Sequence, residues 1–414
     1  LHTLGLSRSD LMNPEANMTS LNTNIQSALS GLPTQTVQYT GTDVDDLNQF
    51  LQNNTGKIVQ LTQDIQVYKN TNGSFGIIMV PSDTILDGNG HRLVMKAGYT
   101  EAPDVGVVLY VYKDGVIPST NCGVKNLSTD IPYVNSINVF SADNILLENN
   151  TLNNATNSGI MISDEYGSTV NGMIRGNTIN NVGNDAIAVY GNHSNLLIDS
   201  NRISGAKGFA GIAISCLQNG QQIRVDNETT GPHDIIVTGN VISGCSGEAL
   251  YCIGSYKTYI TYNTLRDSIL EGVCLDSGCI GNYFAHNEVV NNGIAGGLPG
   301  VSIDNGIYNI VDSNNVYNNS CSGIKLVRTG LGNIIVNNIC TDNAYNQMGA
   351  KSSGIDIEPL AVETENLGYI DGLGSNWNVV LNNTVTGSHD FGVFIADDDT
   401  ANNGGSSCEN VIMY

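Results

Sequence analysis

Residues 271–289 read EGVCLDSGCIGNYFAHNEV, and residues 185–203 read DAIAVYGNHSNLLIDSNRI. Both stretches open with an acidic and a small residue, alternate apolar residues with others, and end on Asn-x-Val or Asn-x-Ile. The Asn recurs at spacings of 23 to 27 residues, apart from two longer gaps that contain insertions. A regular period of this size indicates a solenoid of stacked repeats. The recurring residues are Asn150, Asn177, Asn201, Asn240, Asn263, Asn287, Asn314, Asn337 and Asn383.

The alternation inside each repeat has a period of two and is rich in Ile and Val, which is typical of strands. Three short strands with their turns fill such a repeat and leave no room for a helix. The segment 80–91, VPSDTILDGNGH, reads as an entry coil. These features resemble the right-handed parallel β-helix of the pectin-lyase-like superfamily, over residues 80–414. We therefore expect an all-β, single-stranded right-handed parallel β-helix with an N-terminal helical cap, in which the recurring Asn side chains stack.

The chain divides into an N-terminal part, residues 1–76, and the β-helix, residues 77–414. Asn13 and Pro14 are typical of a helix start, and Leu21 and Ile25 lie on one face of that helix. We expect this helix to cover the apolar end of the solenoid, with an oligomer contact as the alternative. Residues 36–39 read as a strand, residues 43–52 as a short helix, and residues 102–120 as an interruption. Insertions at 217–232, 291–299, 343–351 and 359–376 flank one strand position and are predicted to build the binding face.

Composition limits the partners. The chain has 16 Lys+Arg against 39 Asp+Glu, a formal charge of −23, which argues against nucleic acid or an anionic membrane as the main partner. No apolar run is long enough to span a membrane. The acidic balance and the Asn sequons favour a secreted protein. Nine cysteines lack Cys-x-x-Cys spacing, so a zinc site is not expected. Cys216 with Cys245, or Cys274 with Cys279, are the disulfide candidates.

The repeat also predicts which side chains face outward. When the small residue that opens each strand is aligned, the residues one and three positions later are apolar and face the core. The residues two and four positions later must face solvent, which places four carboxylates and one lysine on one exposed sheet surface. The carboxylates are Asp276, Asp304, Asp356 and Glu358; the expected substrate contacts are Lys325, Arg328, Tyr251, Tyr190 and Asn305.

Asp276 and Asp304 occupy the same column in adjacent coils, about 4.8 Å apart. Like charges at this distance push one pKa upward and so produce an acid and a base. Such a spacing suits a retaining glycosidase, whereas Asp304 against Asp356 or Glu358, roughly 10 Å apart, is nearer the inverting case. The alternatives are a calcium ion held between coils or plain surface charge. Lys325 is explained equally by a salt bridge with Asp304 or Asp356.

Glu248 and Glu271 precede the small residue in adjacent coils and form a reserve acid/base pair, or serve as turn residues. The resemblance implies a carbohydrate-active enzyme, and the charge favours a neutral glycan. We expect a glycoside hydrolase or a transglycosylase such as a fructotransferase, a type of enzyme built as a homotrimer, with no required cofactor or metal. Gly-His-Gly and the epimerase signature Tyr-Gly-Phe/Ile-Asp-Pro-His are absent. The alternatives are a Ca²⁺-dependent polysaccharide lyase with Lys325 or Arg328 as base, and a non-catalytic glycan-binding solenoid.

Overall fold

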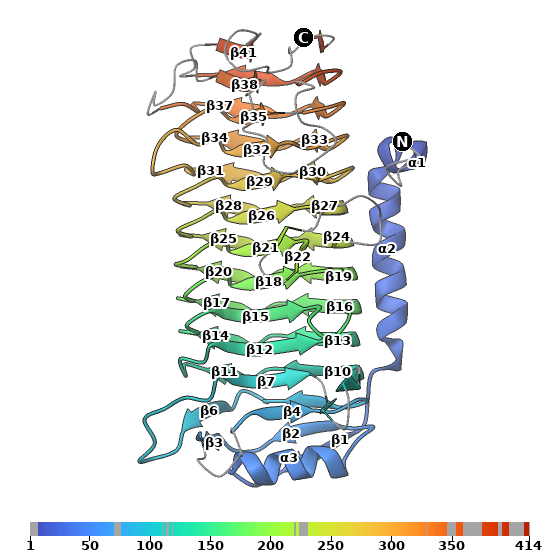
Figure 1. Cartoon of the computed structure of the whole chain (residues 1–414), viewed down its shortest axis with the longest axis vertical. Coiled ribbons are helices and arrows are strands. Elements are labelled where there is room, and N and C mark those ends of the chain that lie inside the picture. The colour runs from blue at the N-terminus through green and yellow to red at the C-terminus, as the bar shows by residue number, and fades with distance from the viewer. Residues whose placement is uncertain are drawn as a thin grey trace.

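A computed structural model shows a parallel β-solenoid with one long axis (Figure 1). It describes residues 7–69, 76–109, 111–112, 116–117, 119–218, 221–222, 231–328, 330–345, 353–358, 375–387, 391–396 and 410–413. The predicted all-β parallel β-helix is confirmed. Each full coil contributes one strand to each of three parallel sheets, so every strand pairs with the next coil.

Sheet A contains 14 strands within the described residues. They are β1 (Thr36–Tyr39), β2 (Ile58–Leu61), β5 (Ile85–Asp87), β10 (Ser119–Lys125), β13 (Ala142–Glu148), β16 (Val170–Arg175), β19 (Ser194–Asp199), β24 (His233–Thr238), β27 (Tyr256–Thr261), β30 (Tyr283–Ala285), β33 (Ile310–Asp312), β36 (Ile334–Val336), β39 (Val379–Leu381) and β42 (Val411–Met413).

Sheet B contains 12 strands in the described part of the chain. They are β3 (Ile65–Val67), β6 (Arg92–Met95), β11 (Ser128–Thr129), β14 (Thr151–Asn153), β17 (Thr178–Asn180), β20 (Arg202–Ser204), β25 (Val241–Ser243), β28 (Thr264–Arg266), β31 (Glu288–Val290), β34 (Asn315–Tyr317), β37 (Ile339–Thr341) and β40 (Thr384–Thr386).

Sheet C also has 12 described strands and carries the candidate site. They are β4 (Ile78–Val80), β7 (Val105–Leu109), β12 (Asn135–Phe140), β15 (Ser158–Ser163), β18 (Ile187–Tyr190), β21 (Ile212–Ser215), β26 (Leu250–Ile253), β29 (Val273–Asp276), β32 (Val301–Asp304), β35 (Ile324–Val327), β38 (Ser353–Glu358) and β41 (Phe391–Ile395). Two antiparallel hairpins project from the coils: β8 (Val111–Tyr112) with β9 (Val116–Ile117), and β22 (Leu217–Gln218) with β23 (Gln221–Gln222).

Stacked Asn side chains run through the interior. Asn263 Nδ2 donates to Asn287 Oδ1 at 3.0 Å and to the Val237 carbonyl at 2.9 Å. Each member thus satisfies backbone groups of neighbouring coils, which keeps buried polar groups hydrogen-bonded. The predicted stacking is confirmed along Asn150, Asn177, Asn201, Asn240, Asn263, Asn287, Asn314, Asn338 and Asn383.

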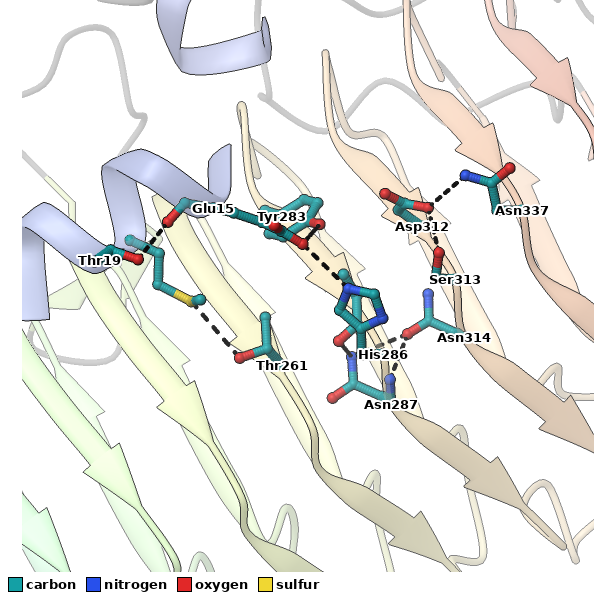
Figure 2. Close-up of polar contacts among 12 residues, drawn as sticks. Glu15, Thr19, Thr261, Tyr283, His286, Asn287, Asp312, Ser313, Asn314 and Asn337 are labelled. Atoms are coloured by element: carbon teal, nitrogen blue, oxygen red, sulfur yellow. Dashed lines mark hydrogen bonds and ion pairs between the residues drawn. The ribbon is translucent and has the colours of Figure 1, made fainter. Parts of the chain in front are cut away.

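One predicted member of this stack is wrong. Asn338, not Asn337, accepts from Asn314 at 2.9 Å. Asn337 is exposed, has a φ of +58° and donates to Asp312 at 3.0 Å (Figure 2). Because the sequence has Asn at both positions, spacing alone could not separate the inner residue from its neighbour. Further Asn stacks were not predicted, among them Asn282, Asn309, Asn333, Asn378 and Asn410; Asn292, Asn319 and Asn343; and Asn121, Asn144, Asn171 and Asn195.

The N-terminal helices divide two tasks. Helix α3 (Val44–Asn53) covers the first coil, with Val44, Leu47 and Leu51 buried in the main core (Figure 1). Helix α1 (Arg8–Met12), helix α2 (Pro14–Ala28) and the short helix η2 (Leu29–Gly31) precede it in the chain. The N-terminal helical cap is therefore present and is made by the helix predicted over residues 43–52.

The expectation that the helix starting near Asn13 forms the lid is wrong. Helix α2 lies along the outside of sheet A, parallel to the solenoid axis (Figure 1). Its Leu21 and Ile25 pack against outward apolar residues of sheet A such as Leu197 and Ile236. An amphipathic pattern predicts that one face is buried, but it does not say against which surface.

Other expectations are corrected in the same way. Cys245, Cys274 and Cys279 are free thiols, so neither disulfide candidate forms. Residues 102–120 do not simply interrupt the pattern, because they contain the regular strand β7. Residues 291–299 form a turn-rich connection without a strand. Most of the insertions 217–232, 343–351 and 359–376 lies outside the described residues. Within the described chain, no helix is long and apolar enough to cross a membrane.

Candidate active site

The register of sheet C places the predicted outward columns as expected. Tyr251 pairs with Cys274, and Lys325 pairs with Asp356. The pairing of Leu275 with Ile303 puts Asp276 beside Asp304 in the next coil. Small residues open these strands because there is no space for a side chain: a Cβ on Gly272 would lie 2.5 Å from Val289 Cγ1. The repeat thus fixes which side chains leave the core together.

Four carboxyl groups gather around the outer side of β29. We call Glu248, Glu271, Asp276 and Asp304 the acid cluster. The pKa of the Cys274 thiol lies well above its usual value, mainly because the thiol is buried. The charges of all four acids raise this pKa further, so all four lie near Cys274. Burial, together with the charges of Glu248, Asp304 and Asp276, raises the pKa of Glu271 to about 7, although a backbone hydrogen bond opposes the rise. The two pairs expected to act separately therefore interact as one group.

Asp304 is the member with the clearest acid character. Burial and then the charge of Asp276 raise the pKa of Asp304 to about 7, although Arg328 opposes the rise. Arg328 Nε lies 3.2 Å from Asp304 Oδ1 without the geometry of a hydrogen bond. The Asp304 side chain is 19% exposed, so a substrate atom can reach it. A carboxyl group that titrates near pH 7 can donate a proton under neutral conditions.

Asp276 is held as a hydrogen-bond acceptor. Tyr251 Oη donates to Asp276 Oδ2 at 2.7 Å, while the Ser277 N–H and hydroxyl donate to Oδ1 at 2.5 and 2.9 Å. Both carboxyl oxygens of Asp276 therefore act as hydrogen-bond acceptors. The Tyr251 ring packs edge-on against Phe209 at 4.9 Å between ring centroids, which fixes the position of its hydroxyl.

Lys325, Asp356 and Glu358 form a second group, which we call the lysine cluster. Lys325 Nζ lies 3.4 Å from Asp356 Oδ2 and 2.9 Å from Glu358 Oε2. Burial lowers the pKa of Lys325, but Asp356 and Glu358 together raise it above its usual value. Burial raises the pKa of Asp356, and Lys325 opposes that rise. The predicted salt bridge of Lys325 is thus made with Asp356 and Glu358, and not with Asp304.

The expectation of one fully exposed face is wrong. Asp356 is 1% exposed, and Asn305, expected to contact substrate, is fully buried. Both amide atoms of Asn305 lack a hydrogen-bond partner within the described structure. Alternation along a strand fixes the direction of a side chain, but the rest of the chain decides whether that direction is covered. Of the predicted set, Asp356, Asn305, Glu248 and Glu271 are buried. The partly exposed members are Asp276, Asp304, Glu358, Lys325, Arg328, Tyr251 and Tyr190.

The family described as "Right handed beta helix region" matches residues 109–230 and 223–406. The chain belongs to this family. No protein with a curated description matches the β-helix protein in sequence.

Solved structures resemble this β-helix at low identity. The AlgE6 A-module, a mannuronan C-5 epimerase of Azotobacter vinelandii, has a TM-score of 0.56 and 11% identity, covering 90% of this chain and 98% of that chain. PfbA, a surface adhesin of Streptococcus pneumoniae, has a TM-score of 0.54 and 12% identity, covering 77% and 92%. At these identities the likeness shows the fold alone.

One buried acid of the β-helix was not among the predicted site residues. Asp185 is fully buried and accepts from Tyr190 Oη and, at 2.9 Å, from the Ala210 N–H. Burial raises the pKa of Asp185 to about 6, although both hydrogen bonds oppose the rise. Tyr190, expected to contact substrate, is thus bound to Asp185. The signal was present, since Asp185 precedes the small residue as Glu248 and Glu271 do.

No group of three or more His, Cys, Asp or Glu side chains in the described structure has a metal-binding arrangement. The neighbouring carboxyl groups of Asp276 and Asp304 are oxygen ligands of the type that Ca²⁺ takes, but Ca²⁺ takes six to eight such ligands. Asp276 accepts from Tyr251 and Ser277, whereas Glu248 Oε2 and Asp304 Oδ1 have no hydrogen-bond partner in the described structure. A calcium ion at this cluster stays a prediction.

Proposed function

We propose that the β-helix protein is a carbohydrate-active enzyme that cleaves or rearranges glycosidic bonds, with the acid cluster as its acid/base machinery. The observation that supports this most is the pairing of Asp304, whose pKa is raised to about 7, with the acceptor Asp276 in the adjacent coil. A protonated and an ionised carboxyl group side by side are what glycoside hydrolysis requires.

In this proposal Asp304 protonates the leaving oxygen, and Asp276 attacks the anomeric carbon or activates water. Adjacent coils are about 4.8 Å apart, which is closer to the retaining than to the inverting spacing. Tyr251 holds Asp276 through its hydroxyl at 2.7 Å. Glu271, whose pKa is also raised to about 7, is the alternative acid. Asp356, Glu358 and Lys325 are assigned a structural role, because their charges bind one another.

A neutral glycan is the proposed substrate. The chain carries a net charge of −23, and Arg328, the cation beside the acid cluster, is already paired with Asp304. A polyuronate would bring its own negative charges against Glu248, Glu271 and Asp276, which like charges disfavour. A mannuronan epimerase among the structural neighbours is consistent with a saccharide substrate. It does not indicate which sugar this protein binds. Secretion and a homotrimer remain predictions.

The contacts of Lys325 count against the lyase alternative. A lyase needs a group that removes a proton, and Lys325 lies between two carboxylates that raise its pKa. A lysine held in its protonated form cannot accept a proton. Arg328 stays protonated in proteins and serves no better. A binding solenoid without catalysis would share the fold but does not require a carboxyl group that titrates near pH 7.

The test is a panel of neutral and uronate polysaccharides incubated with the protein, with and without a chelator. New reducing ends or new oligosaccharides, unaffected by chelator, are expected for a neutral glycan. Ultraviolet absorbance from an unsaturated uronate that disappears on chelation would instead establish a calcium-dependent lyase. Binding of a glycan without any product would leave the adhesin-like solenoid as the function.

A further inference from the structure

A groove of about 400 Å³ runs between helix α2 and the outer face of sheet A. Its floor is formed by residues of β16, β19, β24 and β27, which are successive neighbours in that sheet. Three strand spacings give the floor a length of roughly 14 Å along the axis. The acid cluster lies on sheet C, so this groove belongs to a different surface. A cavity of this volume falls within the range of small-ligand sites.

The helix wall of the groove presents two amide side chains. Asn22 and Gln26 are one turn apart on α2, line the groove and are exposed. Neither side chain makes a hydrogen bond to any other residue in the described structure. On the floor, Thr261 is buried, and its hydroxyl lies 3.6 Å from Met18 Sδ and 3.1 Å from Thr238 Oγ1, which accepts from it. Thr238 is partly exposed and keeps its own hydroxyl proton as a donor. Amides and hydroxyls both donate and accept, which matches the hydroxyl groups of a sugar.

The rim of the groove carries an aromatic ring. Tyr262 is 62% exposed and stacks on His286, with 5.0 Å between ring centroids and 13° between planes. His286 Nε2 in turn lies 3.2 Å from Glu15 Oε1 of α2, so the rim is tied to the helix wall (Figure 2). A fixed, exposed tyrosine offers an apolar face and a polar tip to a pyranose or furanose ring.

The same residues argue against other partners. A peptide cannot add as a strand here, because β16, β19, β24 and β27 are each paired on both sides. An amphipathic helix would need exposed apolar area, but Leu197 and Ile236 on the floor are already buried. The charge of −23 disfavours nucleic acid. The groove itself is balanced, with one arginine, Arg175, and one aspartate, Asp199.

We propose that this groove is a second saccharide-binding site, specific for a neutral oligosaccharide and separate from the acid cluster. Asn22 and Gln26 bind sugar hydroxyls from the helix side, and Tyr262 stacks on a ring at the rim. Such a site holds a long glycan on the protein while another part of the chain meets the acid cluster. The binding does not depend on turnover at Asp304.

The experiment is isothermal titration calorimetry in an Asp304→Asn, Glu271→Gln background, which lacks both candidate acids and is confirmed to form no product from the probes before binding is measured. The probes are hexasaccharides of a fructan, an α-glucan, a β-glucan and a xylan, with an oligomannuronate as the charged comparison. Asn22→Ala with Gln26→Ala is expected to weaken binding of a neutral probe about tenfold, since two hydrogen-bonding groups are lost. Tyr262→Ala, at the rim of the groove, is expected to weaken binding of the neutral probe by a similar factor.

Asn24→Ala is the matched control, because Asn24 is an exposed α2 residue that does not line the groove. It should leave both binding and the thermal midpoint unchanged. The proposal is overturned if no neutral probe binds, if the oligomannuronate alone binds, or if the groove variants bind as tightly as the parent. Because binding is measured without turnover, a failure of the proposed enzymatic activity would leave this result standing, and the reverse also holds.

Discussion

The acid cluster and the lysine cluster occupy nearby coils of sheet C and are built from similar residues, but their charges are balanced differently. In the lysine cluster, one ammonium lies 3.4 and 2.9 Å from two carboxylates. In the acid cluster, Arg328 pairs with Asp304 from a side chain that is 40% exposed, and no ion pair in the described structure reaches Glu248, Glu271 or Asp276. Burial raises the pKa of Asp304 and of Asp356 alike. The clusters differ in the cation that opposes this rise, which is a partly exposed arginine at Asp304 and a mostly buried lysine at Asp356.

The largest expected effect follows from removing either carboxyl group of Asp276 and Asp304, which we call the central pair. Asp304→Asn and Asp276→Asn should each lower kcat by about 100-fold to 10,000-fold, because acid/base or nucleophilic chemistry is lost while the shape is kept. The rate of new reducing ends on the substrate found by the panel measures this. Glu271→Gln tests the alternative acid: if it abolishes activity and Asp304→Asn does not, the roles are exchanged.

Lys325→Met should break the lysine cluster and lower the free energy of unfolding by roughly 3 kcal/mol, because two carboxyl groups lose their buried partner. Chemical denaturation measures the loss. The activity per folded molecule should stay within about twofold of the parent. The triple change Lys325→Met, Asp356→Asn and Glu358→Gln should recover much of the stability. A hundredfold fall in kcat with intact stability would instead make Lys325 a catalytic residue.

The pH dependence of stability separates Asp304 from ordinary surface acids. Folded Asp304 keeps its proton up to about pH 7, whereas the unfolded chain releases it near pH 4. Folding therefore retains a proton in this window, and the contribution of Asp304 to stability falls as the pH rises from about 4 to about 7. Asp304→Asn should raise the free energy of unfolding at pH 8 by roughly 4 kcal/mol and change it little at pH 4. If Asp304→Asn changed the free energy of unfolding equally at pH 4 and pH 8, the pKa of Asp304 would be the same in the folded and the unfolded chain, which would contradict the prediction.

The smallest expected effect concerns the hydroxyl of Tyr251. Tyr251→Phe removes the donor 2.7 Å from Asp276 and should lower kcat about tenfold, with KM little changed. Tyr190→Phe is the matched control, since its hydroxyl binds Asp185 outside the acid cluster. Steady-state kinetics on both variants decide the point. Equal losses would show that neither tyrosine acts through the central pair.

Much of this arrangement could be predicted from the repeat. The alternation of apolar residues gave the pairing of Lys325 with Asp356, and it placed Asp276 beside Asp304. This works because a solenoid has local, regular contacts, so one period fixes the register of the next coil. The spacing is less informative where two Asn residues are adjacent. It does not distinguish Asn337 from Asn338, which is the residue inside the stack.

What the repeat could not predict depends on segments that do not follow it. The burial of Asp356 and Asn305 depends on what covers sheet C, and the position of α2 depends on an apolar column outside sheet A. The grouping of Glu248 and Glu271 with Asp276 and Asp304 crosses two different columns, so alignment within one column hid it. The direction of a side chain follows from the sequence repeat. Whether another segment buries that side chain, and which residues of different columns lie close together, is seen only in the three-dimensional structure.

The central claim is that the acid cluster holds a proton at neutral pH. Carbon-13 carboxyl titration by NMR tests it without a substrate, comparing the parent with Asp304→Asn and Asp356→Asn. Because Asp304 and Glu271 both have a pKa of about 7, at least two carboxyl steps are expected in this region. The account predicts that the Asp304 step disappears in Asp304→Asn and persists in Asp356→Asn. It is contradicted if no step near pH 7 is lost in Asp304→Asn, because Asp304 would then be ionised at neutral pH and could not act as the acid.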